Sequence, residues 1–171
     1  MAKVKANRIA VYVYRSGPAG VEFLQLRRAA GSGDYAGTWQ TVYGGIKSGE
    51  TAIAAARREL QEETGLTPRR MHQVEYLEGF YHRARDHVTF LPVFAVGVGR
   101  SAKITLDAEH DDHRWVPLAD VGTHFVWRVQ RRAIAIIVED IIQGSPARDL
   151  LRIKAEPPSR DEIKDGPEKD A

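Results

Sequence analysis

Three glutamates of one predicted helix are the residues best placed to do chemistry in this sequence. Glu59, Glu62 and Glu63 are spaced i, i+3 and i+4, so a helix places their carboxylates on one face. Like charges at this spacing destabilise an isolated helix by about 0.2–0.5 kcal/mol per pair. A hard divalent cation reverses that sign, because Mg²⁺ and Mn²⁺ prefer carboxylate and water oxygens. For the glutamates alone, a solvated acidic face is the alternative interpretation.

A glycine-rich loop followed by an alanine-rich segment predicts the element that positions these glutamates. Residues 44–49 read Gly-Gly-Ile-Lys-Ser-Gly and predict a loop, because glycine adopts backbone angles that are closed to other residues. Residues 52–61 contain four alanines and no helix breaker, and Gly65 is the expected end of the helix. The helix can dock on a core through an apolar stripe of Ile53, Ala56 and Leu60.

The spacing of the constrained residues between positions 44 and 66 resembles the signature of the Nudix hydrolases. The residues that agree with the signature are Gly44, Glu50, Arg58, Glu59, Leu60, Glu62, Glu63, Gly65 and Leu66. The resemblance extends over roughly residues 8–142. It implies a loop–helix–loop that binds a divalent metal, in an enzyme that hydrolyses a nucleoside diphosphate linked to another moiety.

The resemblance also implies how a metal would be held. Glu59, Glu62 and Glu63 would hold one or more Mg²⁺ ions, and Mn²⁺ is the alternative cation. A backbone carbonyl of Gly44 or Gly45 is a further expected ligand. Cations are needed in such chemistry because the negative charges around phosphorus otherwise repel an incoming water.

Three more residues take on roles through the resemblance. Glu109, in an acidic segment before Trp115, is expected to be a fourth carboxylate that reaches the metals or acts as base; a solvated turn is the alternative. Arg58 resembles the family arginine that orients the neighbouring glutamate, and Glu50 is expected to support the loop. The proton acceptor is left open among four carboxylates: Glu59, Glu62, Glu63 and Glu109.

Candidate substrate contacts precede the glutamates in the sequence. The resemblance implies that Arg27, at the end of a predicted strand, faces the substrate phosphates, although a solvated arginine is the alternative. Lys47 in the glycine-rich loop is a second candidate with the same alternative, and Gly45 of that loop is the third. One neighbouring position departs from the family pattern. The family commonly has a proline directly before the two glycines, whereas this chain has Tyr43, which affects the start of the loop rather than the metal site.

The rest of the chain predicts a mixed sheet and a second helix. Runs of β-branched and aromatic residues predict strands at 9–14, 21–26, 39–42, 71–81 and 88–98, with a short strand ending at 115–116. Pro92 indicates an edge strand or a bulge. A second amphipathic helix is predicted over 127–143, ending at Gly144. The order of elements indicates an α/β (α+β) fold with the sheet between two helices. The resemblance implies the same Nudix-type α/β/α sandwich.

Length and composition predict a single domain followed by a polar tail. Of 171 residues, 43% are hydrophobic and 28% charged, which is typical of a soluble globular protein. Residues 1–144 are predicted to form the Nudix domain and 145–171 the tail, in which Leu150, Leu151 and Ile153 could still dock on the domain. The absence of cysteine excludes disulfides and thiol catalysis.

The same features bound the compartment and the partners. No secretory signal is expected at the N-terminus, and no apolar run approaches the ~18 residues of a membrane span, so we expect a cytoplasmic protein without membrane contact. A net charge of +2 and the lack of a dense basic run do not favour nucleic acid as a partner. His82 and His87 are predicted to be polar residues at a hairpin tip rather than metal ligands.

Within the family, the sequence is similar to enzymes that cleave dATP and dihydroneopterin triphosphate, around Trp39-Gln40 and Glu109-His110. This predicts hydrolysis of a nucleoside or dihydroneopterin triphosphate to a monophosphate and pyrophosphate, by a monomer or homodimer. ADP-ribose, dinucleoside polyphosphates and the 5′ end of RNA are alternative substrates. A non-catalytic nucleotide-sensing module is the alternative class, but such modules usually have lost part of the glutamate set that this chain keeps.

Overall fold

The computed structural model describes residues 2–31 and 35–154 of the chain. The strands are β1 (Lys3–Lys5), β2 (Arg8–Gly17), β3 (Gly20–Arg28), β4 (Trp39–Gln40), β5 (Val42–Gly45), β6 (Arg70–His82), β7 (His87–Val98), β8 (His110–Pro117) and β9 (Arg152–Ile153). The helical elements are α1 (Ala52–Thr64), α2 (Val121–His124), α3 (Arg128–Ile136), the 3₁₀ turns η1 (Arg83–Arg85) and η2 (Leu118–Asp120), and the π-helical segment η3 (Ile137–Gly144).

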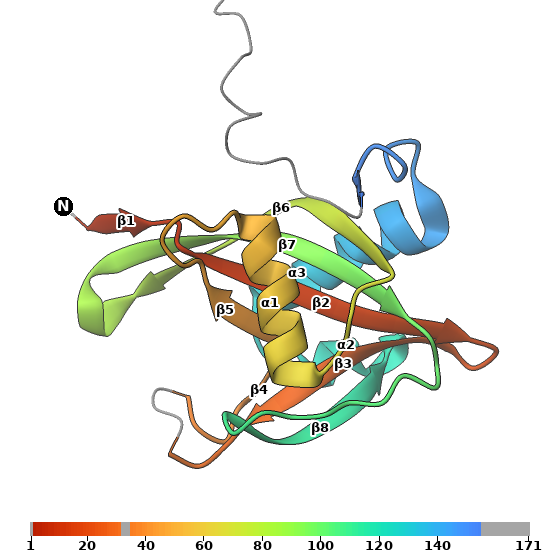
Figure 1. Cartoon of the computed structure of the whole chain (residues 1–171), viewed down its shortest axis with the longest axis horizontal. Coiled ribbons are helices and arrows are strands. Elements are labelled where there is room, and N and C mark those ends of the chain that lie inside the picture. The colour runs from red at the N-terminus through yellow and green to blue at the C-terminus, as the bar shows by residue number, and fades with distance from the viewer. Residues whose placement is uncertain (1, 32–34, 155–171) are drawn as a thin grey trace, which may run out of the picture.

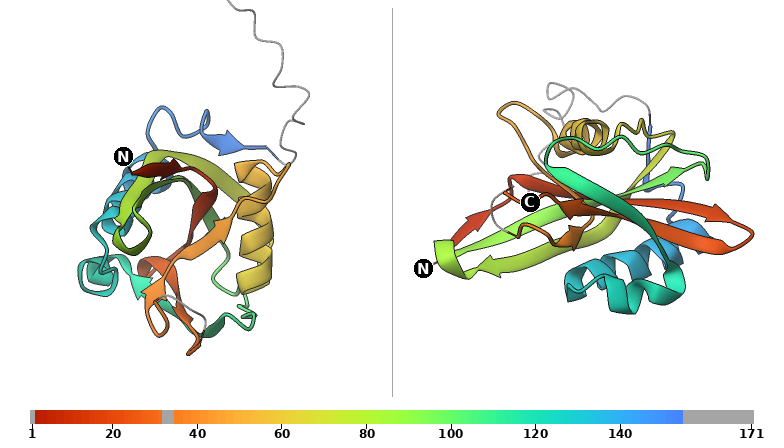
Figure 2. Two further views of the ribbon diagram at one scale, coloured as in Figure 1. Left: turned by 90° about the vertical axis from the view of Figure 1, so that its left-hand side faces the viewer. Right: turned by 90° about the horizontal axis from the view of Figure 1, so that it is seen from below.

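The strands form one mixed sheet between helices. Its central order is β4-β3-β2-β7-β6-β9, with β5 and β8 paired to β2 and β3 and with β1 paired to β7. β2 runs parallel to β7 but antiparallel to β3 and β5. Helix α1 covers one face of the sheet, while α3 and η3 cover the other (Figure 1, Figure 2). This architecture confirms the predicted α+β fold with a mixed sheet between two helical layers.

Alternation along β2 divides the interior into two cores. Residues Ile9, Val11 and Val13 belong to the core under α1, whereas Ala10, Tyr12 and Tyr14 belong to the core under α3. This division follows from the strand geometry, in which successive side chains point to opposite faces. Because β2 is covered on both faces, its sequence is a continuous apolar run rather than an alternating one.

Helix α1 begins and ends where the sequence predicts. The Thr51 hydroxyl caps its N-terminus by accepting a hydrogen bond from the Ala54 N–H at 3.2 Å. At the other end, Gly65 adopts a left-handed φ of 69° and donates its N–H to the Gln61 carbonyl at 2.9 Å. Leu60 is fully buried against the sheet, and burying a leucine is worth about 1.5–3 kcal/mol. The caps therefore define both ends of the helix, and its buried apolar residues hold it against the sheet.

A bulge interrupts the hairpin of β6 and β7 at Pro92. The pairing passes from Val74↔Val93 to Leu77↔Pro92, which leaves extra residues on β6. Since β7 lies between β2 and β6, the proline marks a bulge and not an edge strand. His82 and His87 close the same hairpin as strand residues, with their rings stacked 5.1 Å apart.

The C-terminal part of the described chain returns to the sheet. The predicted second helix is α-helical only to Ile136 and continues as the π-helical segment η3, which ends at Gly144 with a φ of 92°. β9 then pairs with β6 through Met71↔Ile153, whereas Leu150 is 89% exposed. Residues 155–171 lie outside the described part, so the division of the chain at residue 144 stays a prediction.

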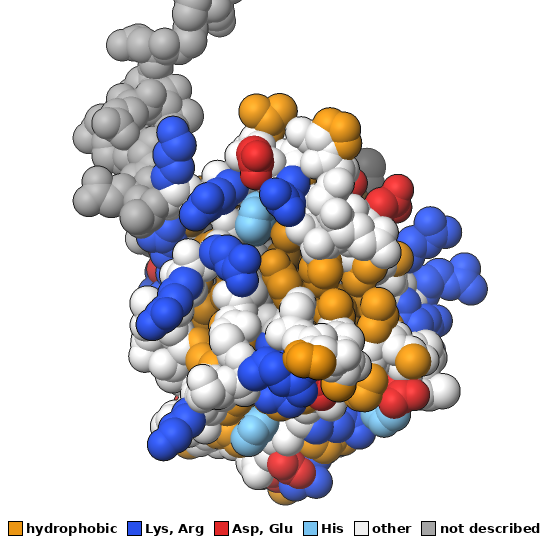
Figure 3. Space-filling view, turned by 90° about the vertical axis from the view of Figure 1, so that its right-hand side faces the viewer, with side chains coloured by type: hydrophobic (Ala, Val, Ile, Leu, Met, Phe, Trp, Pro, Cys, Tyr) orange, Lys and Arg blue, Asp and Glu red, His pale blue; other side chains and the backbone are white. Residues whose placement is uncertain are grey.

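The surface at one end of the molecule is shown in Figure 3. There an apolar centre is bordered by scattered Lys and Arg side chains, with Asp and Glu side chains toward the edges of the view (Figure 3).

Among residues 2–31 and 35–154, no helix is both long enough and apolar enough to cross a membrane.

Candidate active site

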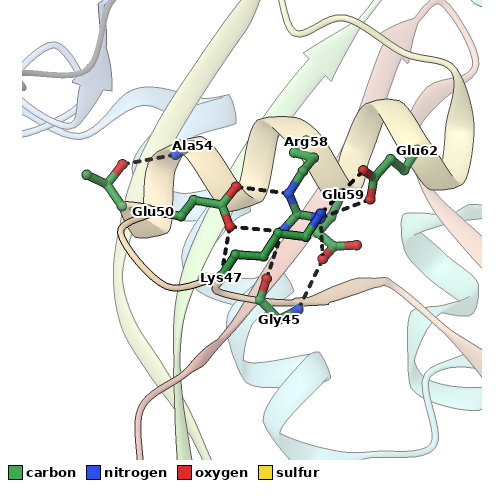
Figure 4. A network of polar contacts seen from close by, with 8 residues as sticks. Gly45, Lys47, Glu50, Ala54, Arg58, Glu59 and Glu62 are labelled. Atoms are coloured by element: carbon green, nitrogen blue, oxygen red, sulfur yellow. Dashed lines mark hydrogen bonds and ion pairs between the residues drawn. The ribbon is translucent and has the colours of Figure 1, made fainter.

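The guanidinium of Arg58 gathers three carboxylates on the exposed side of α1 (Figure 4). It donates to Glu50 through Nε at 2.9 Å and through Nη2 at 2.9 Å. Its Nη1 donates to Glu59 at 2.8 Å and to Glu62 at 2.9 Å. A planar guanidinium can bind several carboxylates at once, because it presents five N–H donors in a rigid fork. Arg58 thus hydrogen-bonds to the neighbouring glutamates, and its role of orienting them for a metal stays a prediction.

The same arginine ties the helix to the glycine-rich loop. Its Nη2 donates to the Gly45 carbonyl at 2.8 Å, while the Lys47 N–H donates to Glu50 at 2.9 Å. The hydrogen bonds from Arg58, and then that from Lys47, lower the pKa of Glu50 to about 2 despite some loss of solvation. Glu50 is therefore an ionised support of the loop.

Gly44 leaves room for Glu59. A Cβ at position 44 would lie 2.0 Å from Glu59 Cγ, a distance that no side chain can adopt without displacing the glutamate. The next residue completes the seat, because the Gly45 N–H donates to Glu59 Oε1 at 3.1 Å. Glycine is therefore required at position 44 for close approach, whereas position 45 contributes backbone groups that any residue except proline would supply.

Glu63 is buried beside these groups without a hydrogen-bond partner. It is 4% exposed, and its Oε2 accepts no hydrogen bond from any described residue. Burial, followed by the charges of Glu59, Asp107 and Glu109, raises the pKa of Glu63 to about 9, while Arg28 opposes the shift. His110 Nε2 lies 3.9 Å from Oε2. A buried carboxylate near other carboxylates is the arrangement that a cation would stabilise.

Glu109 enters this neighbourhood from the loop before β8. It is exposed, and one of its oxygens lies 3.7 Å from Arg28 Nη1. Asp107 holds the loop in place, since its Oδ1 accepts the Glu109 N–H at 3.1 Å and lies 3.0 Å from His110 Nδ1. The charge of Glu109 contributes to the raised pKa of Glu63. The structure therefore brings the fourth predicted carboxylate toward α1.

Carboxylate oxygens are the ligands that a hard divalent cation prefers, but in this structure the glutamate side chains do not point toward one common position. In the part of the chain that the structure describes, no three His, Asp or Glu side chains form a group that could hold an ion. Arg58 engages Glu59 and Glu62, which turns one oxygen of each toward the guanidinium. Glu62 is half exposed and can rotate. The unpartnered oxygen of Glu63 and the nearby charge of Glu59 favour a cation between these two carboxylates.

The two predicted basic contacts lie in different surroundings. Lys47 Nζ is 3.9 Å from Glu62 and is well exposed, so it lies at the carboxylate group. Arg27 lies on the β8 side, where Nε donates to Asp111 at 2.6 Å and Nη2 is 3.8 Å from Asp112. The hydrogen bond to Asp111 raises the pKa of Arg27. The structure therefore brings Lys47 to the site and places Arg27 on two aspartates.

Arg28 is the cation that the sequence analysis did not select. It follows Leu24 and Leu26 at even positions of β3, and both leucines belong to the core under α1. Arg28 consequently points to the α1 face, where it approaches Glu109 and opposes the raised pKa of Glu63. The alternation of β3 was the signal that could have identified it.

The sequence of this chain matches the family model of the NUDIX domain over residues 6–135. The chain belongs to the NUDIX family. A domain of this family accounts for the loop, helix and carboxylates described above, and divalent cations are general in it.

Two curated relatives match only part of the chain. The octanoyltransferase of Myxococcus xanthus is 38% identical over 87 residues, which are 47% of this chain and 23% of that protein. The RNA pyrophosphohydrolase of Roseobacter denitrificans is 31% identical over 107 residues, which are 52% of this chain and 65% of that protein. The chain thus covers less than two thirds of the length of either relative.

Solved structures agree on the fold. The MutT protein of Methanosarcina mazei is 28% identical with a TM-score of 0.62, covering 77% of this chain and 92% of its own. The E. coli dihydroneopterin triphosphate pyrophosphohydrolase is 23% identical with a TM-score of 0.63, covering 83% and 100%. The C. elegans Ap4A hydrolase complex is 19% identical with a TM-score of 0.64, covering 81% and 96%.

Proposed function

We propose that this chain is a Mg²⁺-dependent pyrophosphohydrolase that cleaves a phosphoanhydride bond of a nucleoside or dihydroneopterin triphosphate, giving a monophosphate and pyrophosphate. Mn²⁺ is the alternative cation. The observation that supports the proposal is the pair Glu59 and Glu62 on Arg58 together with Glu63 of the same helix, one oxygen of which is buried with no hydrogen-bond partner among the described residues. A non-catalytic module would have no use for a buried carboxylate that costs free energy in the absence of a ligand.

The side chains divide the work of binding and hydrolysis. Glu59, Glu62 and Glu63 would hold the cation together with the Gly44 carbonyl, and Glu109 would approach from the opposite loop. The cation, when bound, supplies positive charge that neutralises the polyphosphate and acidifies water. Arg58 holds Glu59 and Glu62 at fixed distances from the loop.

Phosphate contacts and the proton acceptor complete the proposed site. Lys47 and the Gly45 N–H would contact phosphate from the loop, and Arg27 would do so only after release from its aspartates. The proton of the attacking water requires a carboxylate within hydrogen-bond reach. Glu59, Glu62, Glu63 and Glu109 are the candidates for this proton acceptor.

Hydrolysis of a panel of substrates tests the proposal, measured as pyrophosphate release from the triphosphates and as release of the nucleotide product from the other substrates. The panel contains dATP, the other nucleoside triphosphates, dihydroneopterin triphosphate, diadenosine tetraphosphate and ADP-ribose, each with Mg²⁺, with Mn²⁺ or with a chelator. We expect turnover of at least one triphosphate that the chelator abolishes. No turnover of any substrate with either cation would reject the proposed function.

A second substrate is favoured by one of the relatives. The RNA pyrophosphohydrolase of Roseobacter denitrificans is 31% identical over 107 residues, so the 5′-triphosphate end of RNA is the second candidate. Comparing a 5′-triphosphorylated oligonucleotide with the free triphosphate of the same nucleotide separates the two. A higher kcat/KM for the oligonucleotide would replace the small-molecule substrate by RNA.

The remaining features of the proposal concern the setting of the enzyme. We place it in the cytoplasm, acting on small nucleotide or pterin polyphosphates as a monomer or homodimer. The catalytic domain is proposed to comprise residues 1–144, with 145–171 as a polar extension. Size-exclusion chromatography with light scattering measures the oligomeric state directly.

A further inference from the structure

A buried polar cluster lies on the face of the sheet opposite to α1. The carboxylate of Glu78 is 1% exposed and accepts hydrogen bonds from two phenols, those of Tyr12 and Tyr43. The bond from Tyr43 to Glu78 Oε2 measures 2.7 Å. Gln130 Nε2 in turn donates to the Tyr43 hydroxyl at 3.1 Å. Tyr43 is thus the residue that joins the carboxylate to helix α3.

Burying this cluster costs free energy of desolvation, which suggests that the cluster has a role beyond stability. Removing a carboxylate from water is unfavourable unless its oxygens are hydrogen-bonded, and each oxygen of Glu78 receives one phenol. Gln130 is fully buried as well, and its Oε1 has no partner among the described residues. Apolar side chains of similar volume would fill this space without the penalty. The cluster therefore contributes position rather than mere stability.

The four residues come from four different elements. Tyr12 lies on β2, Tyr43 on β5, Glu78 on β6 and Gln130 on α3. β5 is four residues long and pairs with β2 through Ile9↔Gly44 and its neighbours. So short a strand has few backbone hydrogen bonds to fix it. The hydrogen bonds of the Tyr43 hydroxyl add two attachments, one to Glu78 of β6 and one to Gln130 of α3.

The alternation of side chains along β5 connects the hydrogen bonds of Tyr43 to the candidate metal site. Tyr43 points to the α3 face, so Gly44 faces α1, where the absent side chain admits Glu59. Gly45 follows and makes both backbone contacts with the helix, its N–H to Glu59 and its carbonyl to Arg58. Any displacement of Tyr43 along the strand therefore moves the two glycines against the carboxylates.

We propose that Tyr43 is a positioning residue for the candidate metal site. Its hydroxyl, held by Glu78 and Gln130 behind the sheet, fixes the Gly44–Gly45 backbone that seats Glu59 and Arg58 in front of it. The consequence for catalysis rests on the proposed function, whereas the consequence for the backbone does not.

Tyr43→Phe tests the proposal, with Tyr12→Phe as the matched control. Each variant removes one buried phenol hydroxyl from the same carboxylate, but only the first removes a hydroxyl that belongs to β5 itself. In the metal-free protein, NMR measures hydrogen exchange of the Gly45 amide. We expect exchange to be about tenfold faster in Tyr43→Phe, because the Gly45 N–H bond to Glu59 opens more often, and within about twofold of wild type in Tyr12→Phe.

Activity provides the second readout. Tyr43→Phe is expected to raise the Mg²⁺ concentration for half-maximal rate and to lower kcat by about tenfold, with KM for substrate at saturating Mg²⁺ nearly unchanged. Gln130→Met removes the donor to Tyr43 while leaving Glu78 in place, and it should shift both readouts in the same direction by less. This variant also serves if Tyr43→Phe does not fold, and thermal melts verify folding of each.

Three outcomes separate this proposal from the proposed function. Gly45 exchange unchanged in a folded Tyr43→Phe would overturn the positioning role. An equal effect of Tyr12→Phe would also overturn it, because the whole cluster would then matter and not Tyr43. If the Gly45 amide responds as expected but wild-type protein hydrolyses nothing, the positioning role stands and only the proposed function fails.

Discussion

Glu63 is the buried carboxylate of the candidate site. Its Oε2 is buried and unpartnered, next to the charges of Glu59 and Glu109. A neutral amide of the same size has no charge to desolvate. The free energy of folding and the affinity for a cation should therefore respond in opposite directions to the same substitution.

Glu63→Gln and Glu62→Gln should each lower kcat by orders of magnitude. In the metal-free protein, the melting temperature should stay at or above that of wild type for Glu63→Gln and change little for Glu62→Gln. The reason is that glutamine keeps the size of the side chain but removes the anionic ligand. Steady-state kinetics with Mg²⁺ and thermal melts measure both effects. Glu75→Gln, at an exposed position of β6, is the control and should change neither. Near-wild-type turnover of both site variants would remove the metal-site hypothesis.

Gly44→Ala should be destabilising and inactivating because of a steric conflict. The added Cβ would lie 2.0 Å from Glu59 Cγ, so Glu59 or the β5 backbone must move, at a cost of about 1–3 kcal/mol. Gly45→Ala is the matched control for stability, because a Cβ there meets no atom within 4 Å. Urea unfolding compares the two. Equal stability of the two variants would show that Glu59 is not seated against Gly44.

At the scale of elements, the loop and α1 form one unit clamped by the ion pair of Arg58 and Glu50. Both side chains are largely shielded, at 20% and 15% exposure, and two hydrogen bonds join them. The pKa of Glu50 is lowered from an ordinary 4.5 to about 2 by these bonds. A lowered carboxyl pKa contributes stability that is present above the unfolded pKa and is lost as pH falls through the folded one.

Glu50→Gln should therefore flatten the acid limb of the stability curve. At pH 6 the wild type should be more stable than the variant, and the difference should shrink between about pH 4.5 and pH 2, where Glu50 becomes protonated in the wild type. Urea unfolding at a series of pH values measures the difference. A difference that stays constant down to pH 2 would mean that the ion pair is not the source.

The elements themselves were largely predictable, whereas contacts distant in sequence were not. Local signals were sufficient for α1, with Gly65 as its end, and for the bulge at Pro92. Tyr12 and Glu78 are separated by 66 residues, and nothing in the sequence around either residue indicates that the two side chains form a hydrogen bond. β9 is two residues long and forms only because β6 offers a free edge. Such features depend on tertiary pairing, which periodicity does not encode.

Local sequence signals also placed the α1 residues of the candidate site, but they did not distinguish between the two arginines of β3. The glutamates and Arg58 lie within one turn or two of a single helix, so their spacing fixes their common face. Arg28 and Arg27 are adjacent on β3 and point to opposite faces, and the selection between them requires knowing which face α1 covers. The roles of the site residues await the substitutions described above.

At the scale of the whole molecule, a cation at this site would join parts of the fold that are separate along the chain. Its ligands would come from the loop after β5, from α1 and from the segment before β8. A ligand that binds only the folded protein stabilises it by RT ln(1 + [L]/Kd), about 2.7 kcal/mol at a concentration of 100 Kd.

Mg²⁺ should accordingly raise the melting temperature. For a domain of this size, about 2.7 kcal/mol corresponds to a rise of about 5–10 °C at 100 Kd. The rise should saturate with Mg²⁺ concentration, disappear with a chelator, and be largely absent in Glu63→Gln, which lacks one ligand. KCl at equal ionic strength separates binding from general screening, because exposed charges respond to both salts. A melting temperature that is indifferent to Mg²⁺ and to Mn²⁺, or that rises equally with KCl, would show that the acidic face of α1 holds no cation.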